Sequence, residues 1–182
     1  MKKRGQAKKA ITEMIQQAVE LIDKMPTRIN KMNLIQTIRE ATEGKFFVEV
    51  EYANCTRMLS EMHEEDGEQQ KAADVILDVQ VETYGSMKKE DKLDYILYQL
   101  RLVLDLKDYV RTMIILKKIQ RRNLNDKGVE HLKVRYYELS IRYYIHEKDH
   151  LETAKCFQTI YDTILENSDK ACFSADQMHQ AF

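Results

Sequence analysis

Proline and glycine are scarce in this sequence, and tryptophan is absent. One Pro and five Gly among 182 residues exclude collagen-like and low-complexity chains and disfavour a turn-rich β-sandwich. A formal net charge of −1 argues against a strongly basic nucleic-acid binder and against an acidic disordered tail. The chain is long enough for a real core, so the sequence predicts a helix-rich domain or one segment of a larger protein.

Long apolar runs and paired cysteines are also missing. No stretch approaches the roughly 18 consecutive apolar residues that span a bilayer, and the longest clean run is residues 113–116. The lysine-rich N-terminus lacks the apolar segment of a secretory signal. Cys55, Cys156 and Cys172 have no metal-ligand spacing and are expected to act as small apolar side chains. We therefore expect no membrane partner and a reducing, intracellular compartment.

The few helix breakers lie between segments of helical periodicity. Residues 7–25 carry apolar side chains on one helical face, Pro26 ends that segment, and Thr27 suits the N-cap of a second helix over 28–42. The remaining joints are marked by glycines, which tolerate the left-handed position at a helix C-terminus. These glycines are Gly44, Gly67, Gly85 and Gly128.

Three short turns indicate an internal repeat. The turns begin at Gly67, Asp108 and Asp149, which are 41 residues apart. The same offset aligns apolar residues of the preceding helices at steps of three and four, which is the spacing of one helical face. The aligned sets are Tyr52, Leu93 and Val134; Cys55, Ile96 and Tyr137; Leu59, Leu100 and Ile141; Met62, Val103 and Tyr144; and, after the turn, Ala72, Met113 and Ala154; Val75, Leu116 and Phe157. Small residues at positions 72 and 154 predict that the paired helices approach closely.

The predicted fold class is an all-α, TPR-like α-solenoid of antiparallel helical hairpins with a period near 41 residues. A leading hairpin over 7–42 precedes repeats over 45–83, 88–122 and 129–166, and residues 167–182 are expected to form a tail or a partial helix. The predicted organisation is thus a single helical-repeat segment over residues 1–182.

An apparent zinc-protease motif, H-E-x-x-H, occurs in the third repeat. In a zinc hydrolase, His146 and His150 would share one helical face and bind the metal, while Glu147 would activate water. The repeat register instead places the motif across a turn, with Asp149 as N-cap and Glu152 completing a capping box. A zinc hydrolase therefore stays the less favoured alternative.

Two further groups of residues have both a structural and a functional interpretation. The basic stretch 117–122 and the basic N-terminal residues could contact phosphate, as in a nucleic-acid-binding repeat, or an acidic protein. A solvated helix end explains the first group better, and a frayed terminus explains the second at least equally well. Four tyrosines of the last repeat cannot all face inward, so they either pack between repeats or anchor a partner. They are Tyr136, Tyr137, Tyr143 and Tyr144.

No Gly-rich phosphate loop, Ser-His-Asp constellation or Cys-rich metal cluster is present in the sequence. We therefore assign no catalytic, cofactor-binding or metal-ligating residue. We expect no cofactor, no small-molecule substrate and no nucleic-acid partner.

Several segments, in the same order, resemble one family. They are residues 42–51, 66–68, 72–77, 107–112, 117–119 and 160–163, and the most distinctive is the run Val79-Gln80-Val81-Glu82-Thr83-Tyr84-Gly85-Ser86-Met87. The family is non-ATPase regulatory subunit 12 of the proteasome, a subunit of the lid of the 19S regulatory particle. The resemblance covers roughly residues 2–165.

This resemblance implies a PCI-type protein, in which a TPR-like helical arm precedes a PCI domain whose winged helix mediates lid assembly. It implies a non-enzymatic scaffold that contacts other lid subunits in ubiquitin-dependent degradation, in the cytoplasm and the nucleus. The lid's deubiquitinase activity belongs to another subunit. Because no room is left after residue 165, we expect an arm segment without the winged-helix domain. A related subunit of the COP9 signalosome or of a translation initiation factor is the alternative.

Overall fold

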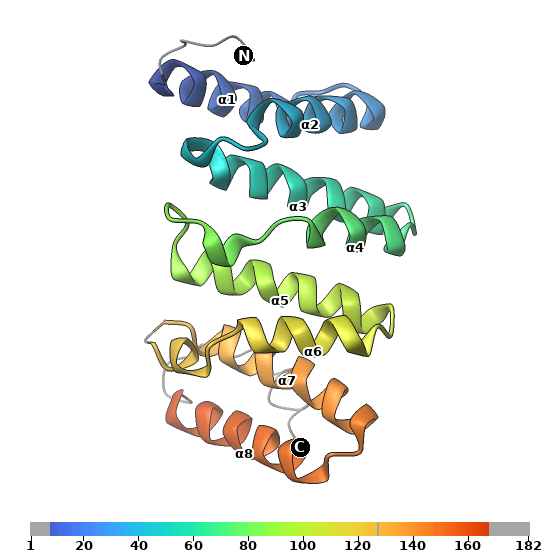
Figure 1. The fold of residues 1–182 in the computed structure, drawn as a ribbon, viewed down its shortest axis with the longest axis vertical. Helices are drawn as coiled ribbons and strands as arrows, with labels where there is room; N and C mark the ends of the chain where they lie inside the picture. Colours follow the sequence, from blue (N-terminus) through green and yellow to red (C-terminus); the bar gives the residue numbers. More distant parts are fainter. Residues whose placement is uncertain (1–7, 127, 168–182) are drawn as a thin grey trace. The chain divides into compact units, whose positions relative to one another are not determined.

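The computed structural model describes residues 8–126 and 128–167, and every regular element in that part of the chain is helical (Figure 1). The α-helices are α1 (Lys8–Ile22), α2 (Arg28–Thr42), α3 (Glu49–Glu65), α4 (Gln69–Leu77), α5 (Lys89–Asp105), α6 (Tyr109–Lys118), α7 (Glu130–Glu147) and α8 (His150–Asn167). Three short 3₁₀ helices, η1 (Phe46–Val48), η2 (Val81–Thr83) and η3 (Arg121–Asn125), lie in the longer connections. Within the described residues, no helix is long and apolar enough to cross a membrane.

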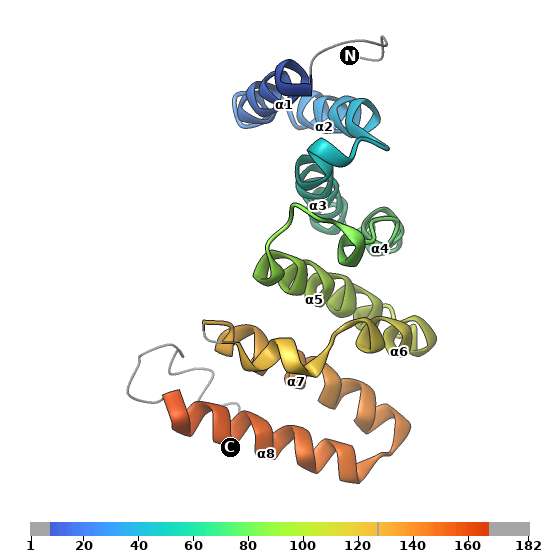
Figure 2. The same ribbon diagram turned by 60° about the vertical axis from the view of Figure 1, so that its left-hand side comes forward.

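The chain divides into two compact units, residues 1–88 and residues 89–182. In each unit, consecutive α-helices run antiparallel as hairpins that stack on one another (Figures 1 and 2). Each unit by itself is therefore a short all-α solenoid, and this part of the predicted fold class is confirmed. The predicted tail 168–182, Cys172 and the basic residues before Lys8 lie outside the described residues.

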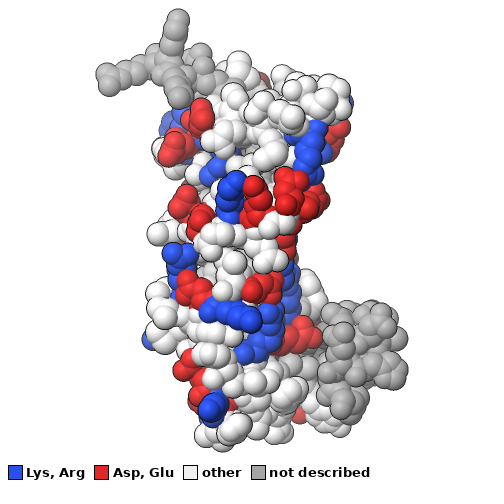
Figure 3. Space-filling model, turned by 90° about the vertical axis from the view of Figure 1, so that its right-hand side faces the viewer, with Lys and Arg blue, Asp and Glu red and all other residues white. Residues whose placement is uncertain are grey.

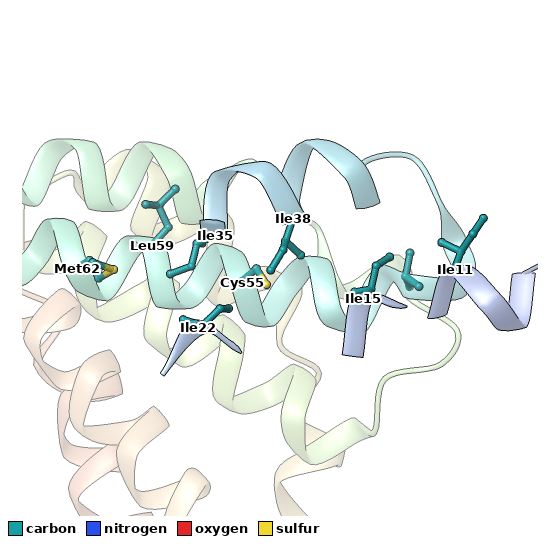
Figure 4. Close-up of a cluster of buried hydrophobic side chains, with 9 residues drawn as sticks. Ile11, Ile15, Ile22, Ile35, Ile38, Cys55, Leu59 and Met62 are labelled. Atoms are coloured by element: carbon teal, nitrogen blue, oxygen red, sulfur yellow. The ribbon is translucent and has the colours of Figure 1, made fainter. Parts of the chain in front are cut away.

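The core of the first unit lies between α1, α2 and α3. One face of each helix is apolar, and these faces meet in a cluster of nine buried side chains, eight of which are labelled in Figure 4. Burying one such side chain stabilises the fold by about 1.5–3 kcal/mol. The cluster consists of Ile11, Ile15, Ile22, Ile35, Ile38, Val48, Cys55, Leu59 and Met62.

The joint between α1 and α2 follows the predicted chemistry. Pro26 lies in the turn after α1, and the Oγ1 of Thr27 accepts a hydrogen bond from the backbone N–H of Asn30 at 3.2 Å. The predicted N-cap is therefore confirmed. Arg28, the first residue of α2, then reaches the end of α3, where its guanidinium lies 2.7 Å from Glu65 and 2.9 Å from Asp66 and donates to the carbonyl of Met62 at 2.6 Å.

The turn inside each later hairpin has one residue in the left-handed region. In the α3–α4 turn this residue is Gly67, with φ +77°, and the N–H of Glu68 closes the turn on the carbonyl of His63 at 2.8 Å. Lys107 and Lys148, each with φ +59°, occupy the same place before α6 and α8. This is the Schellman arrangement, in which a left-handed residue ends a helix. The intervals between these three residues are 40 and 41 positions, so Lys107, and not Asp108, corresponds to Gly67.

The shorter first interval explains why the aligned sets after the turn do not all face inward. Ala72 is buried, but Met113 and Phe157 are 38% and 46% exposed, and Ala154 is exposed. In α6 the position that corresponds to Ala72 is occupied by Thr112, which is fully buried. The predicted close helix contact at Ala154 was therefore wrong, and Met113 and Phe157 do not occupy the positions that correspond to Ala72 and Val75. A one-residue slip rotates a helical position by about 100°, which turns a core residue toward the surface.

In the second unit, α7 and α8 pack against each other, and α7 also contacts α5 and α6. Four buried side chains, Val134, Ile141, Cys156 and Ile160, form the α7–α8 core. Between α5 and α7, the guanidinium of Arg135 donates to Asp94 at 2.9 Å. At the far end of the same helices, Asp105 binds Arg101 and Arg142, at 3.1 and 2.7 Å. Apolar burial and these ion pairs together align the helices of the unit.

Candidate protein-interaction surfaces

The apparent zinc motif forms the corner between α7 and α8. His146 and Glu147 are the last residues of α7, Lys148 is the left-handed turn residue, and His150 begins α8. The imidazole of His146 stacks on the ring of Tyr109, with 3.4 Å between ring centroids and 9° between planes. The two histidines belong to different helices, so they lack the shared face that a zinc hydrolase requires. Among the residues that the structure describes, no group of three or more His, Cys, Asp or Glu could hold a metal ion.

The corner does contain the predicted cap. The Oδ1 of Asp149 accepts a hydrogen bond from the backbone N–H of Glu152 at 3.0 Å, which confirms Asp149 as the N-cap of α8. The reciprocal half of the capping box is not formed, because the N–H of Asp149 donates to the carbonyl of Tyr144 at 3.0 Å. The carboxylate of Glu152 binds Lys155 and Arg121 instead, at 2.6 and 3.5 Å.

The tyrosines of α7 belong mostly to the interior of the second unit. Tyr136 is only 3% exposed, and Tyr137 and Tyr144 pack against the α7–α8 core. Burial raises the pKa of Tyr137 and Tyr144, although the nearby Arg121 opposes the rise. Tyr143 is half-buried, as Tyr137 and Tyr144 are. The four tyrosines are therefore not all fully buried, as the sequence predicts. Packing within the unit therefore explains these rings better than a partner does.

The basic stretch 117–122 divides between structural and exposed residues. The Nη2 of Arg121 lies 3.5 Å from Glu152 and 3.4 Å from the hydroxyl of Tyr144, so Arg121 ties η3 to α7 and α8. Arg122 donates to the side chain of Gln120 at 2.9 Å. Lys117 is exposed at the end of α6. On the face drawn in Figure 3, acidic and basic side chains are interspersed within each unit, whereas a nucleic-acid site needs a basic stripe.

The described thiols are unsuited to nucleophilic chemistry. Cys55 and Cys156 are 0% and 2% exposed. Burial raises the pKa of the Cys55 thiol to about 11 and also raises the pKa of Cys156. Because the thiolate is the reactive form, both cysteines act as small apolar side chains, as the sequence predicts.

The outer face of α6 has three exposed apolar side chains within two helical turns. Val110 is 70% exposed, Ile114 is 51% exposed and Met113 is 38% exposed. These residues are three and four positions apart, so they form one continuous strip, here called the α6 ridge. Figure 2 shows α6 at the edge of its unit, beside α5 and α7. Sequence reasoning missed this surface, because it considered the run 113–116 only as a possible membrane-spanning stretch and did not say which of its residues face outward.

Other exposed apolar side chains lie on α2, η1 and α8. Ile29 on α2 is 71% exposed, and Phe46 in η1 is 68% exposed, with the ammonium of Lys8 4.7 Å from its ring centroid. The exposed apolar residues of α8 are Leu151, Phe157, Tyr161 and Leu165. Stacked hairpins that carry apolar side chains on their outer faces are typical of a binding surface.

Comparison with known proteins identifies the family. Residues 1–169 match the sequence profile described as PSMD12/CSN4, N-terminal. The chain belongs to this family. The resemblance to proteasome subunit 12 that the sequence motifs indicate is thereby confirmed.

Relatives of this PSMD12/CSN4 N-terminal chain include proteins named as proteasome subunits. It is 37% identical over 162 residues to the 26S proteasome non-ATPase regulatory subunit 12 of Dictyostelium discoideum, covering 89% of this chain and 36% of the relative. Identity is 39% over 184 residues to homolog A of the same subunit from Arabidopsis thaliana, with coverages of 88% and 42%. Identity is 38% over 172 residues to the 26S proteasome regulatory subunit RPN5 of Saccharomyces cerevisiae, with coverages of 93% and 39%. The chain thus spans well under half the length of these relatives.

Proposed function

We propose that this chain is the helical-repeat part of a non-catalytic scaffold subunit of the proteasome regulatory particle lid. In this role it assembles with other lid subunits and serves ubiquitin-dependent protein degradation in the cytoplasm and the nucleus. The observation that carries the proposal is the family match over residues 1–169, joined by relatives that are named as 26S proteasome subunits.

The mechanism of such a scaffold is the presentation of shaped surfaces. Each hairpin buries its inner face, as Leu100 of α5 and Ile115 of α6 do, and leaves an outer face for partners. The left-handed turn residues and the Arg135–Asp94 pair hold neighbouring helices in fixed register. A preorganised surface loses little conformational entropy on association, which favours stable assembly.

The proteasome is favoured over the COP9 signalosome or a translation initiation factor because the relatives described above are named as proteasome subunits. A zinc hydrolase is disfavoured because His146 and His150 lie on different helices. Metal analysis of the purified chain and of His150→Ala separates the two classes. We expect no stoichiometric zinc in either protein, and one zinc per chain that is lost in the variant would contradict the scaffold.

The assembly proposal is tested by expressing the tagged chain in cells and identifying co-purified proteins by quantitative mass spectrometry. Lid subunits are expected at a constant ratio to the chain, and His150→Ala should recover them equally well. Leu100→Asp serves as the negative control, because an unpaired charge at a fully buried position destroys the fold. Absence of lid subunits, or recovery of signalosome or initiation-factor subunits in their place, would overturn the proposal.

A further inference from the structure

The α6 ridge is surrounded by positive charge. From Tyr109 to Lys118, α6 contains no acidic residue and three basic ones, Arg111, Lys117 and Lys118. Lys107 precedes the helix, and Arg122 follows it. A partner that covers Val110, Met113 and Ile114 therefore meets a cationic margin.

The two acidic side chains that precede α6 are engaged within the second unit. Asp108, the N-cap of α6, accepts the backbone N–H of Arg111 at 3.0 Å and pairs with its guanidinium at 3.3 Å. Asp105 is held between Arg101 and Arg142. These carboxylates do not neutralise Lys117, which is exposed two turns further along α6.

The packing of a hairpin does not require this apolar strip. Val110 and Ile114 are the second and sixth residues of α6, and the second and sixth residues of α4 are Gln70 and Asp74, both exposed. In α8 the residues at these places are Leu151 and Lys155, both exposed, so the second helix of a hairpin does not need an apolar residue at both places. The apolar residues on α6 instead fit a contact with another molecule, because exposed apolar patches mark interaction sites.

We propose that the α6 ridge docks an acidic amphipathic helix of another protein. The apolar stripe of such a helix would cover Val110, Met113 and Ile114, and its flanking Asp or Glu side chains would face the exposed Lys107 and Lys117. The ridge and Lys117 together extend about 10 Å along α6, which matches two turns of a partner helix with anchors at i, i+3 or i+4, and i+7. The proposal goes beyond the assembly role, since it assigns a surface and a partner chemistry.

Peptide probes test this proposal with the purified 182-residue chain. The first probe is a labelled 18-residue helical peptide with a leucine stripe flanked by glutamates. The second has lysines in place of the glutamates, and the third is a scrambled acidic peptide without a stripe. Fluorescence anisotropy at low and high salt measures the affinities. We expect the glutamate peptide to bind at least about tenfold more tightly than either other peptide, because steering and apolar contact must act together.

Variants locate the site. Val110→Glu combined with Ile114→Glu should weaken binding of the glutamate peptide at least tenfold. The matched control is Ile29→Glu, because Ile29 is as exposed as Val110 but lies on α2; its affinity should stay within twofold of wild type. Lys117→Glu should weaken binding of the glutamate peptide and strengthen binding of the lysine peptide. Circular dichroism checks that each variant is folded. If the Val110→Glu and Ile114→Glu variant is unfolded, the milder Val110→Ser and Ile114→Ser variant takes its place.

Four results would overturn the proposal. Three of them concern the peptides, and they are unchanged binding by the ridge variants, equal binding of the lysine and glutamate peptides, and no binding of the glutamate peptide at millimolar concentration. Preferential binding of a 20-nucleotide RNA that depends on Lys117 but not on Ile114 would assign the surface to nucleic acid and would also overturn it. No proteasome subunit is present in these assays, so their failure is distinct from failure of the assembly proposal.

Discussion

Arg135 of α7 donates a hydrogen bond to Asp94 of α5 across 2.9 Å, and the two residues lie 41 positions apart in the sequence. Their side chains are 34% and 30% exposed, so solvent screens the pair only in part. The separation equals the predicted repeat length, which means that the pair joins corresponding places on successive first helices of the hairpins.

A double-mutant cycle with Arg135→Ala and Asp94→Ala should give a coupling free energy of about 0.5–1 kcal/mol, measured by urea unfolding, because the pair is short and half-buried. The control pair is Lys9 and Glu13, whose charged atoms are 3.9 Å apart and whose side chains are 89% and 60% exposed. Its coupling should be close to zero. Equal coupling in the two cycles would show that the α5–α7 pair has no special role.

The close approach of α3 and α4 predicts that position 72 does not tolerate a larger side chain. Ala72 is 0% exposed, and its carbonyl accepts the hydroxyl of the buried Ser60 at 2.8 Å. We expect Ala72→Leu to lower the free energy of unfolding by about 1–3 kcal/mol through overpacking. Ala154→Leu, on the exposed face of α8, should change it by less than about 0.5 kcal/mol. Thermal and urea unfolding of both variants measure the difference, and similar losses would contradict the assignment.

The left-handed turns predict opposite effects of glycine at equivalent positions. Gly67 has φ +77°, and a Cβ there would meet nothing within 4 Å, so Gly67→Ala costs only the backbone strain, about 1 kcal/mol. Lys148 already bears this strain at φ +59°, so Lys148→Gly should raise the free energy of unfolding by a similar amount. Lys133→Gly, inside α7, is the control and should destabilise the protein by about 1 kcal/mol. A loss of stability in Lys148→Gly would contradict the turn assignment.

The sequence allowed the helices and most of their joints to be predicted because breakers and caps are local signals. Thr27 and Asp149 act as N-caps through their own side chains, and each is recognisable from its neighbours. The register between the first two repeats could not be predicted this way. Lys107 occupies a left-handed position that normally indicates glycine, so the sequence contains no mark of the turn at that residue.

The candidate interaction surface was beyond sequence reasoning for a related reason. The four apolar residues 113–116 look alike in sequence, but Ile115 and Leu116 are 3% and 8% exposed, whereas Met113 and Ile114 face solvent. Only the orientation of α6 against α5 and α7 decides which of them are core. The family, in contrast, could be recognised from short motifs, because recognition does not depend on which side of a helix is buried.

The buried thiol of Cys55 predicts how stability depends on alkaline pH. In the unfolded chain the thiol ionises with a pKa near 9.0, whereas burial raises its pKa in the folded chain to about 11. Between these values the unfolded chain releases a proton that the folded chain retains, so ionisation favours unfolding. The contribution of Cys55 is therefore complete below pH 9 and is lost as the pH rises toward 11.

Two pKa units correspond to about 2–3 kcal/mol. Between pH 9 and pH 11 the free energy of unfolding of the wild type should therefore fall further than that of Cys55→Ala, by about this amount. The other cysteines, and Tyr84, whose pKa burial raises to about 12, are common to both proteins and cancel in the comparison. Urea unfolding at pH 7, 9, 10 and 11 measures the two curves. At pH 7 the variant should be less stable, because a small cavity replaces the sulfur among Ile15, Ile35 and Ile38. The curves should then converge as the pH rises, and curves that stay parallel would show that Cys55 ionises as readily in the folded chain as in the unfolded one.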